Sequence, residues 1–319
     1  MSNLKIGESQ DTRSTDNPLT MSGPVAIPTS AAYRITSYTY NPIDRANPPE
    51  NPDVTQTTHR INMVNGWAAI PRGGRVLEIG CGQGLCTTVV AEAVGPSGTV
   101  DAIDPGSLDY GAPVTLGQAY EWITASEVGS RINWHQATPE QYLSQTAGEG
   151  LSWDVAVLAH CIWYFKSPDE LERIFRSLSG RVEKICIAEY ALSATAPAAV
   201  PHVLAALARA ALESQRPESD ANVQNILTPD AIKTIGKASG WKLEHEGLLV
   251  PQPGLQDGFW EVGTVHSDGF LEEVEAHVQD PRLNGYLKSS RDAVIASTSL
   301  HGGLKAVLTM DVWLGTFSS

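Results

Sequence analysis

The sequence predicts an α/β protein in which a doubly wound, mostly parallel sheet of seven strands carries helices on both faces. Between residues 75 and 190, short apolar segments of strand character alternate with segments of helical pattern. Strands separated by single helices imply right-handed crossovers and parallel pairing. The first apolar segment, "RVLEI", also runs directly into Gly80, Gly82 and Gly84 and then into a helical segment.

The first part of this pattern contains four strands and three helices. We expect strands at 75–79, 99–103 (ending at Asp104), 131–134 and 154–158, and helices at 85–94, 115–126 and 139–144. The next helix has a strong start signal, because Ser167 can cap it, Pro168 suits its first position and Glu170 can complete a capping box. That helix should end near Gly180, and "KICIAEY" supplies the fifth strand.

After Tyr190 the pattern changes, and the chain should leave the sheet twice before returning to it. The expected elements are an apolar helix near 201–213, a loop at 214–225, a helix from Thr228 to Gly240, a strand in "WKLEHEGLLV", a loop-rich stretch at 251–270, mostly helix at 270–298 and a last strand in "LKAVLTMDVWLGTF". The last two strands could form a hairpin with an insertion between them.

The same reading divides the chain into parts. We expect a disordered tail at 1–30, an N-terminal arm and lid helix at 31–70, and one main domain at 71–319, with substrate-covering insertions at about 191–226 and 251–300.

Charge and cysteine content exclude several function classes. The net charge of −14 would repel nucleic acid and anionic lipid, and the apolar stretch at 201–213 is too short to span a membrane. The four cysteines form no CxxC or Cys/His cluster, and the scattered histidines show no metal-ligand spacing. We therefore expect a cytoplasmic protein with buried, reduced cysteines, no metal, and neither nucleic acid nor membrane as a partner; its oligomeric state is open.

The glycine loop "GCGQG" narrows the choice of ligand. A phosphate-binding loop needs a Lys-Ser or Lys-Thr pair after its glycines, and none follows here. A dinucleotide fingerprint needs a third glycine at the position that Leu85 occupies. Asp104 alone does not decide between ligands, because an acid there would serve the ribose of several cofactors.

Here the chain resembles a known family. "LEIGCGQG" followed by "AIDPG", "DVAVLAHCIWYF" and "KICIAEY" is similar to class I S-adenosylmethionine-dependent methyltransferases, whose first motif is an acid, one residue and GxGxG. "DPGSLDYGAPVTLGQA", "AHCIWYF" and "AEYAL" resemble fungal methyltransferases that modify secondary metabolites. The resemblance covers residues 60–190 well and implies a Rossmann-like fold with S-adenosylmethionine as cofactor and S-adenosylhomocysteine as product.

The resemblance also implies which residues hold the cofactor. Glu78 would order the loop or meet the ammonium end of the cofactor, and Asp104 would accept hydrogen bonds from the ribose hydroxyls or, alternatively, cap a turn before Pro105. At the end of the third strand an acid is lacking, so Thr138 or backbone groups would meet the adenine. The full set of candidates is Glu78, Gly80, Cys81, Gly82, Gly84, Asp104, Pro105, Ala137, Thr138 and His160.

Candidates for the methyl-acceptor side follow from the ends of the strands. His160 follows the fourth strand and could act as a general base, or could be a satisfied structural or cofactor-packing residue. Trp163 and Tyr164 could grip a flat substrate or simply pack the core. The N-terminal arm offers Tyr38 as a second catalytic candidate. Further candidates for substrate contact are Tyr33, Tyr40 and His202.

Together these features predict an enzyme that transfers a methyl group to a small, apolar or aromatic natural product. Protein methylation is a weaker alternative. Two others remain open, namely a protein of the same fold that binds the cofactor without methylating, through a structural role or a rearrangement, and a regulatory member of a complex.

Overall fold

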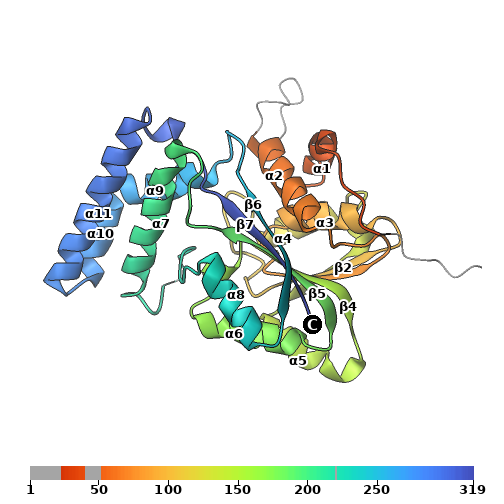
Figure 1. The fold of residues 1–319 in the computed structure, drawn as a ribbon. Helices are drawn as coiled ribbons and strands as arrows, with labels where there is room; N and C mark the ends of the chain where they lie inside the picture. Colours follow the sequence, from red (N-terminus) through yellow and green to blue (C-terminus); the bar gives the residue numbers. More distant parts are fainter. Residues whose placement is uncertain (1–22, 40–51, 220) are drawn as a thin grey trace, which may run out of the picture.

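The computed structural model describes residues 23–39, 52–219 and 221–319, which build one seven-stranded sheet (Figure 1). The strand order is β3-β2-β1-β4-β5-β7-β6. Six strands run in the same direction, and β7 runs opposite to them. The strands are β1 (Arg75–Ile79), β2 (Thr99–Asp104), β3 (Ile132–Gln136), β4 (Trp153–Ala159), β5 (Val182–Tyr190), β6 (Lys242–Leu249) and β7 (Val312–Ser318). The predicted fold class is confirmed, including the final pair of adjacent strands.

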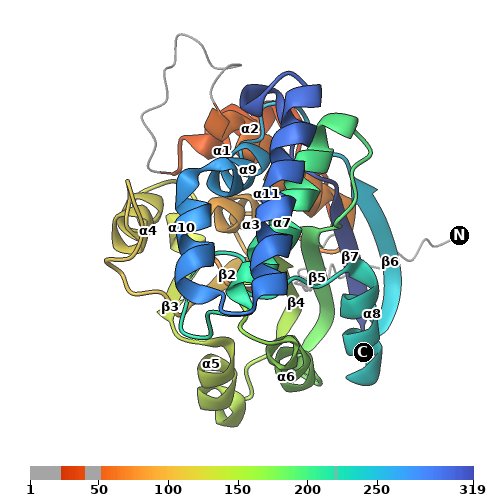
Figure 2. The ribbon, with the colours of Figure 1, turned by 90° about the vertical axis from the view of Figure 1, so that its left-hand side faces the viewer.

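Helices cover both faces of the sheet, as Figures 1 and 2 show. On one face the core is completed by α1 (Ala32–Thr36), α2 (Pro52–Trp67), α3 (Leu85–Val94) and α4 (Leu116–Thr124). On the other it is completed by α5 (Pro139–Gln145), α6 (Pro168–Leu178) and α8 (Pro229–Ala238). Successive residues of β1 point to opposite faces of the sheet, because Val76 belongs to the first core and Leu77 to the second.

Four further helices form a unit with its own apolar core beside the sheet, which we call the helical cap (Figure 1). They are α7 (Val200–Glu213), α9 (Asp257–His266), α10 (Asp268–His277) and α11 (Pro281–Leu300). The chain enters the cap after β5 and after β6, at the carboxyl ends of these two strands, and it leaves the cap after α7 toward α8 and after α11 toward the antiparallel β7. The two segments expected to cover the substrate therefore pack together at the edge where α/β proteins bind ligands.

Two expectations for the C-terminal third are wrong. Residues 251–270 are not loop-rich, because α9 and the start of α10 occupy most of them. Gly258 weakens the helical pattern in the sequence, yet α9 needs it, since a Cβ there would lie 2.6 Å from the carbonyl oxygen of Leu308. The last strand is also shorter than expected and begins at Val312, after a short 3₁₀ helix at Leu304–Ala306.

Two local expectations near the ends of elements also need correction. Ile27 does not belong to a disordered tail: it is buried, and its backbone N–H and carbonyl pair with the side-chain amide of Asn65 at 2.8 Å. The helix after Ser167 starts where predicted, but the capping box does not form. The Ser167 hydroxyl accepts from the N–H of Asp169, and the Glu170 carboxylate accepts from that of Lys166.

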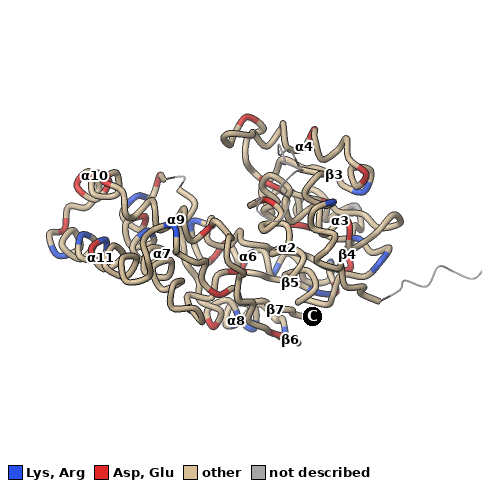
Figure 3. Tube along the Cα trace, turned by 90° about the horizontal axis from the view of Figure 1, so that it is seen from above, with Lys and Arg blue, Asp and Glu red and all other residues tan. Residues whose placement is uncertain are grey.

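The predicted state of the cysteines is confirmed, since all four are buried and free of disulfide bonds. Positive and negative side chains are interspersed along the tube in Figure 3, over the sheet and over the cap. No helix within the described residues is both long and apolar enough to cross a membrane.

Candidate functional site

The glycine loop lies between β1 and α3 and is held by the neighbouring strands. All three glycines have positive φ, at 71°, 50° and 82° for Gly80, Gly82 and Gly84. The N–H groups of Gly80 and Cys81 donate to the carbonyl of Ile103 at 2.9 and 3.1 Å. A Cβ on Gly80 would lie 2.6 Å from that of Cys161, whereas one on Gly82 would meet open space. The loop therefore presents bare backbone at Gly82, where a ligand can approach closely.

Asp104, the last residue of β2, anchors this loop. Its Oδ2 accepts from the N–H of Gly82 at 2.9 Å, and its Oδ1 accepts from that of Gly106 at 2.8 Å. The capping role considered as an alternative is therefore present. It does not exclude a ligand, because a carboxylate offers about four lone-pair sites and these bonds use two. Pro105 follows as an exposed residue.

Glu78 is the buried acid beneath the loop. Its side chain is 1 % exposed, and its Oε2 has no hydrogen-bond partner among the described residues. Burial raises the pKa of Glu78 to about 7, while the nearby Thr87 hydroxyl and Cys86 thiol oppose the shift. A buried carboxyl in this state is stabilised by any cationic group that reaches its free oxygen.

The end of β3 contributes through its backbone and through Trp134. The N–H of Ala137 donates to the carbonyl of Asp104, and the Thr138 hydroxyl caps α5 by accepting from the N–H of Gln141. Trp134 stacks on Tyr120, with ring centroids 4.0 Å apart, and lies against the position a Cβ of Gly84 would take. The tryptophan thus packs where a larger residue in the loop would otherwise stand.

His160 directly follows β4 and is held in an uncommon backbone conformation. Its φ is +53°, and its N–H donates to the carbonyl of Ala188 at 2.8 Å. Its ring lies against three side chains. Nδ1 is 3.5 Å from Oε1 of Glu189, and Nε2 is 3.4 Å from Nε2 of His59. The ring also packs on that of Tyr190, with 4.4 Å between the centroids. Non-glycine residues in this backbone region cluster at functional sites.

Asp257 joins the cap to this site. Its carboxylate accepts from the Tyr190 hydroxyl at 2.7 Å and from the Gln56 amide at 2.8 Å. Burial raises the pKa of Asp257, but Arg60 and the Tyr190 hydrogen bond outweigh it and hold that pKa below its usual range. Residues from α2, β5 and α9 therefore meet on one half-buried charge at the carboxyl edge of the sheet.

The three remaining predicted residues near the cap differ in burial. Trp163 is 3 % exposed and packs on Tyr190 at 5.2 Å, whereas Tyr164 beside it is 53 % exposed. His202 on α7 is fully buried, packs edge-on against Tyr190, and its Nδ1 accepts from the N–H of Met310 at 3.1 Å. Within the part of the chain that the structure describes, the Nε2 of His202 and the Nε1 of Trp163 have no hydrogen-bond partner.

The structure contradicts a catalytic role for Tyr38. Its hydroxyl is bound to Arg34 and donates to Glu127 at 3.1 Å, and Arg34 pairs with Glu92 near the end of α3 that is remote from the glycine loop. Tyr33 is half-buried on the same short helix, which packs on α2 and α3. Tyr40 lies outside the described residues.

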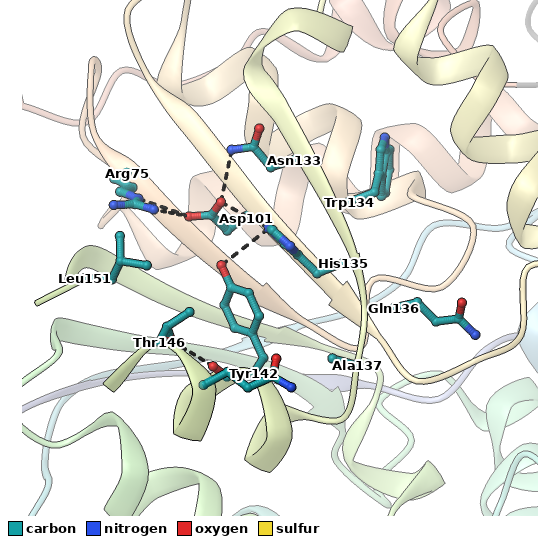
Figure 4. Close-up of a pocket in the computed structure, with 11 residues that line it drawn as sticks. Arg75, Asp101, Asn133, Trp134, His135, Gln136, Ala137, Tyr142, Thr146 and Leu151 are labelled. Atoms are coloured by element: carbon teal, nitrogen blue, oxygen red, sulfur yellow. Dashed lines mark hydrogen bonds and ion pairs between the residues drawn. The ribbon is translucent and has the colours of Figure 1, made fainter. Parts of the chain in front are cut away.

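An open cavity of about 830 Å³ lies along β3, the strand at one edge of the sheet (Figure 4). Its floor is Asp101, whose carboxylate accepts from Arg75, Asn133, His135 and Trp153. Burial raises the pKa of Asp101, but these hydrogen bonds outweigh it and lower that pKa below the usual range. The cavity lining runs along β3 to Gln136 and Ala137, and Ala137 is one of the predicted cofactor residues, so the cavity borders the loop site there. The carboxylate of Asp101 already accepts from four side chains.

Sequence reasoning missed His59, Glu189 and Asp257. Glu189 lies at the end of a predicted strand in "AEY", so the rule that ligands bind at the carboxyl ends of parallel strands could have identified it. His59 and Asp257 lie 101 and 201 residues from their partners His160 and Gln56, and no local pattern marks them.

The buried His202 predicts a specific loss of stability in acid. Burial lowers its pKa to about 4, from about 6.5 in an unfolded chain. Between these values only the unfolded state binds the proton, so the free energy of unfolding falls as the pH drops, by about 2 kcal/mol at pH 5 relative to pH 7. Urea denaturation of the wild type and of His202→Phe at both pH values measures the difference. The variant should lose this part of the dependence, and an identical dependence in both proteins would contradict the prediction.

Comparison with known proteins places these features in context. A family model described as a methyltransferase domain matches residues 56–246. Two fungal proteins from Diaporthe leptostromiformis, methyltransferase phomM′ and methyltransferase phomM, are each 28 % identical, over 76 % of this chain and 73 % of theirs.

Solved structures share the fold. A cyclopropane-fatty-acyl-phospholipid synthase-like protein from Lactobacillus casei superimposes with a TM-score of 0.78 and 28 % identity, over 92 % of this chain and all of that one. A mycolic acid cyclopropane synthase, solved with S-adenosylhomocysteine and CTAB, gives a TM-score of 0.51 at 11 % identity, over 92 % of this chain and 99 % of that one.

Proposed function

The chain belongs to the methyltransferase domain family, and on this premise we propose that it transfers a methyl group from S-adenosylmethionine to a small natural product, releasing S-adenosylhomocysteine. The observation that carries the proposal is the pairing of an open glycine loop with the buried Oε2 of Glu78, which has no hydrogen-bond partner among the described residues. A phosphate would be repelled by this acid, whereas the ammonium group of S-adenosylmethionine would stabilise its charge.

The residues around the loop fit the rest of the cofactor. Asp104 keeps two lone-pair sites beyond its bonds to Gly82 and Gly106, which suits the two hydroxyls of a ribose. Cys81 forms part of the loop backbone, and Thr138 and Ala137 border the place where we expect the adenine. When bound, the cofactor supplies an electrophilic methyl group on a positively charged sulfur.

The chain's contribution to such a transfer is positioning and enclosure. Holding two reactants about 3–3.5 Å apart removes much of the barrier. The cap and α2, linked through Asp257, close the site over the strand ends, which suits a small acceptor. Trp163, Tyr164 and Tyr190 give the acceptor side an aromatic character, and the net charge of −14 disfavours nucleic acid as acceptor. The buried, free cysteines are in keeping with a reducing, cytoplasmic location.

Calorimetric titration with S-adenosylmethionine and S-adenosylhomocysteine tests the proposal. We expect micromolar binding of both, followed by transfer of a labelled methyl group to a component of a metabolite extract. A folded sample that binds neither would contradict the proposal. Binding without any labelling would contradict methyl transfer while leaving the cofactor site in place.

Glu78 predicts that cofactor binding releases protons. With a pKa of about 7, this carboxyl is half protonated at pH 7, so a cation brought to its free oxygen should drive off about half a proton. The apparent binding enthalpy of the wild type should then differ between phosphate and Tris buffers. The matched variant Glu78→Gln should show a smaller difference, because only the ligand's own amino group still titrates. Equal buffer dependence in both proteins would contradict this role of Glu78.

A further inference from the structure

His59 and His160 contact each other end to end. Their Nε2 atoms are 3.4 Å apart, and their ring planes are inclined by only 27° with centroids 5.7 Å apart. His59 is 1 % exposed, so water does not separate it from its surroundings. Two lone pairs facing each other at this distance would repel, and a single proton between the two nitrogens removes the repulsion.

Glu189 determines which nitrogen of His160 carries its own proton. The two carboxylate oxygens accept from the N–H groups of Ile162 and Tyr190, each at 3.0 Å, and Oε1 also lies 3.5 Å from Nδ1 of His160. A carboxylate that already accepts two N–H groups favours an N–H rather than a lone pair at that third position. Nδ1 of His160 makes no hydrogen bond within the described residues, but the charge of the Glu189 carboxylate favours a proton on it, which leaves Nε2 to share the bridging proton with His59.

The backbone keeps His160 in this position at an energetic cost. A left-handed conformation is unfavourable for a non-glycine residue, because its Cβ approaches the following carbonyl oxygen. The hydrogen bond from its N–H to Ala188 fixes that conformation, and the ring then lies between Glu189 and His59. Asparagine or glycine would relieve the strain but would provide no imidazole.

We propose that His59 and His160 act as one proton-accepting pair for the methyl acceptor and that Glu189 is its positioning residue; this rests on the proposed methyl transfer. The acceptor atom bonds to the methyl carbon through its lone pair, the electrons of the carbon–sulfur bond stay on sulfur, and the acceptor's proton passes to Nδ1 of His59. The bridging proton shifts to Nε2 of His160, so the positive charge comes to rest beside Glu189. The pair later returns one proton to water.

The charges around the pair suit this role. The titratable and charged groups that face it come from four elements: Arg60 on α2, Glu189 and Tyr190 on β5, His202 on α7 and Asp257 on α9. Burial lowers the pKa of His59, as do Arg60 and His160, while Asp257 opposes them. His59 thus rests in the neutral state, in which it can accept a proton.

Nitrogen NMR of protein labelled in its imidazole rings tests the pair without any acceptor. We expect His160 to be protonated at Nδ1 near pH 8, and the signals of His59 and His160 to change together as one proton is taken up. In His59→Gln, which retains an N–H group for His160, the ring nitrogen signals of His160 should change, because the proton shared with the second imidazole is lost. In Glu189→Gln, which keeps an oxygen for the backbone donors, the preference for the Nδ1 proton should disappear.

The control His245→Gln, on an exposed residue of β6, should change neither signal. If the nitrogen signals of the two rings change independently with pH, or if His160 carries its proton on Nε2 alone, the proposed proton-accepting pair is wrong. In the labelled-methyl assay with metabolite extract, His59→Gln should lower labelling at least tenfold while calorimetry shows unchanged binding of S-adenosylhomocysteine. Equal labelling by the variant would refute the pair only, whereas no labelling by the wild type would refute the proposed methyl transfer.

Discussion

Replacing Asp104 with alanine should weaken the binding of S-adenosylmethionine and S-adenosylhomocysteine at least a hundredfold. The substitution removes the side-chain anchor of the glycine loop at the N–H of Gly82, and with it the bond to the N–H of Gly106 in the turn after β2. Hydrogen bonds to a charged group contribute about 1.5–3 kcal/mol each, and a hundredfold loss of affinity corresponds to about 2.7 kcal/mol. Calorimetric titration of both ligands measures the effect.

Asp104→Asn is the matched control for this substitution. Its amide keeps one acceptor oxygen, so it should hold one of the two N–H groups and bind with intermediate affinity. Thermal unfolding of each variant separates a local change in the loop from general loss of structure. If Asp104→Ala binds both ligands as tightly as the wild type, the aspartate neither orders the loop for the cofactor nor contacts the ribose.

Replacing Arg209 with methionine should destabilise the helical cap by about 3 kcal/mol. Arg209 is 7 % exposed, and its guanidinium pairs with Glu213 at 3.0 Å and with Glu273 at 2.7 Å. Methionine leaves the buried Glu213 with Arg216 as its remaining partner, also at 3.0 Å. A buried carboxylate that loses a partner retains its desolvation penalty, and urea denaturation measures the resulting loss of stability.

The double variant Arg209→Met with Glu213→Leu distinguishes loss of the ion pair from loss of packing. Removing both charges replaces the pair with apolar side chains and should recover much of the stability that the single variant loses. If the double variant is less stable than the single one by a further large amount, shape rather than charge determines the stability of this part of the cap.

The strands and the glycine loop could be predicted from the sequence because their signals are local. The apolar runs of β1 and β4 and the helix-start signal at Ser167 depend on neighbours within a few residues. The loop "GCGQG" is equally local, since each glycine is needed for its own backbone angle. Even here, the hydrogen bonds around Ser167 differ in detail from the expected capping box.

Other features could not be predicted, because they depend on contacts between distant segments. The pattern of α9 is weak on account of Gly258, and only the chain at Leu308 explains that glycine. Tyr38 is in a segment expected to close over the cofactor, yet packing with Arg34 and Glu127 holds its hydroxyl elsewhere.

The sequence by itself determined the parallel sheet, the order of its first five strands along the chain, and the loop with Glu78 and Asp104 at its borders. Periodicity and backbone conformation are properties of short segments, so they can be recognised without the fold. Only the tertiary structure brought His59 to His160 and Asp257 to Tyr190 and Gln56. These contacts depend on how α2 and the cap pack against the strand ends, and the free energy of that packing is distributed over many residues rather than stored in a motif.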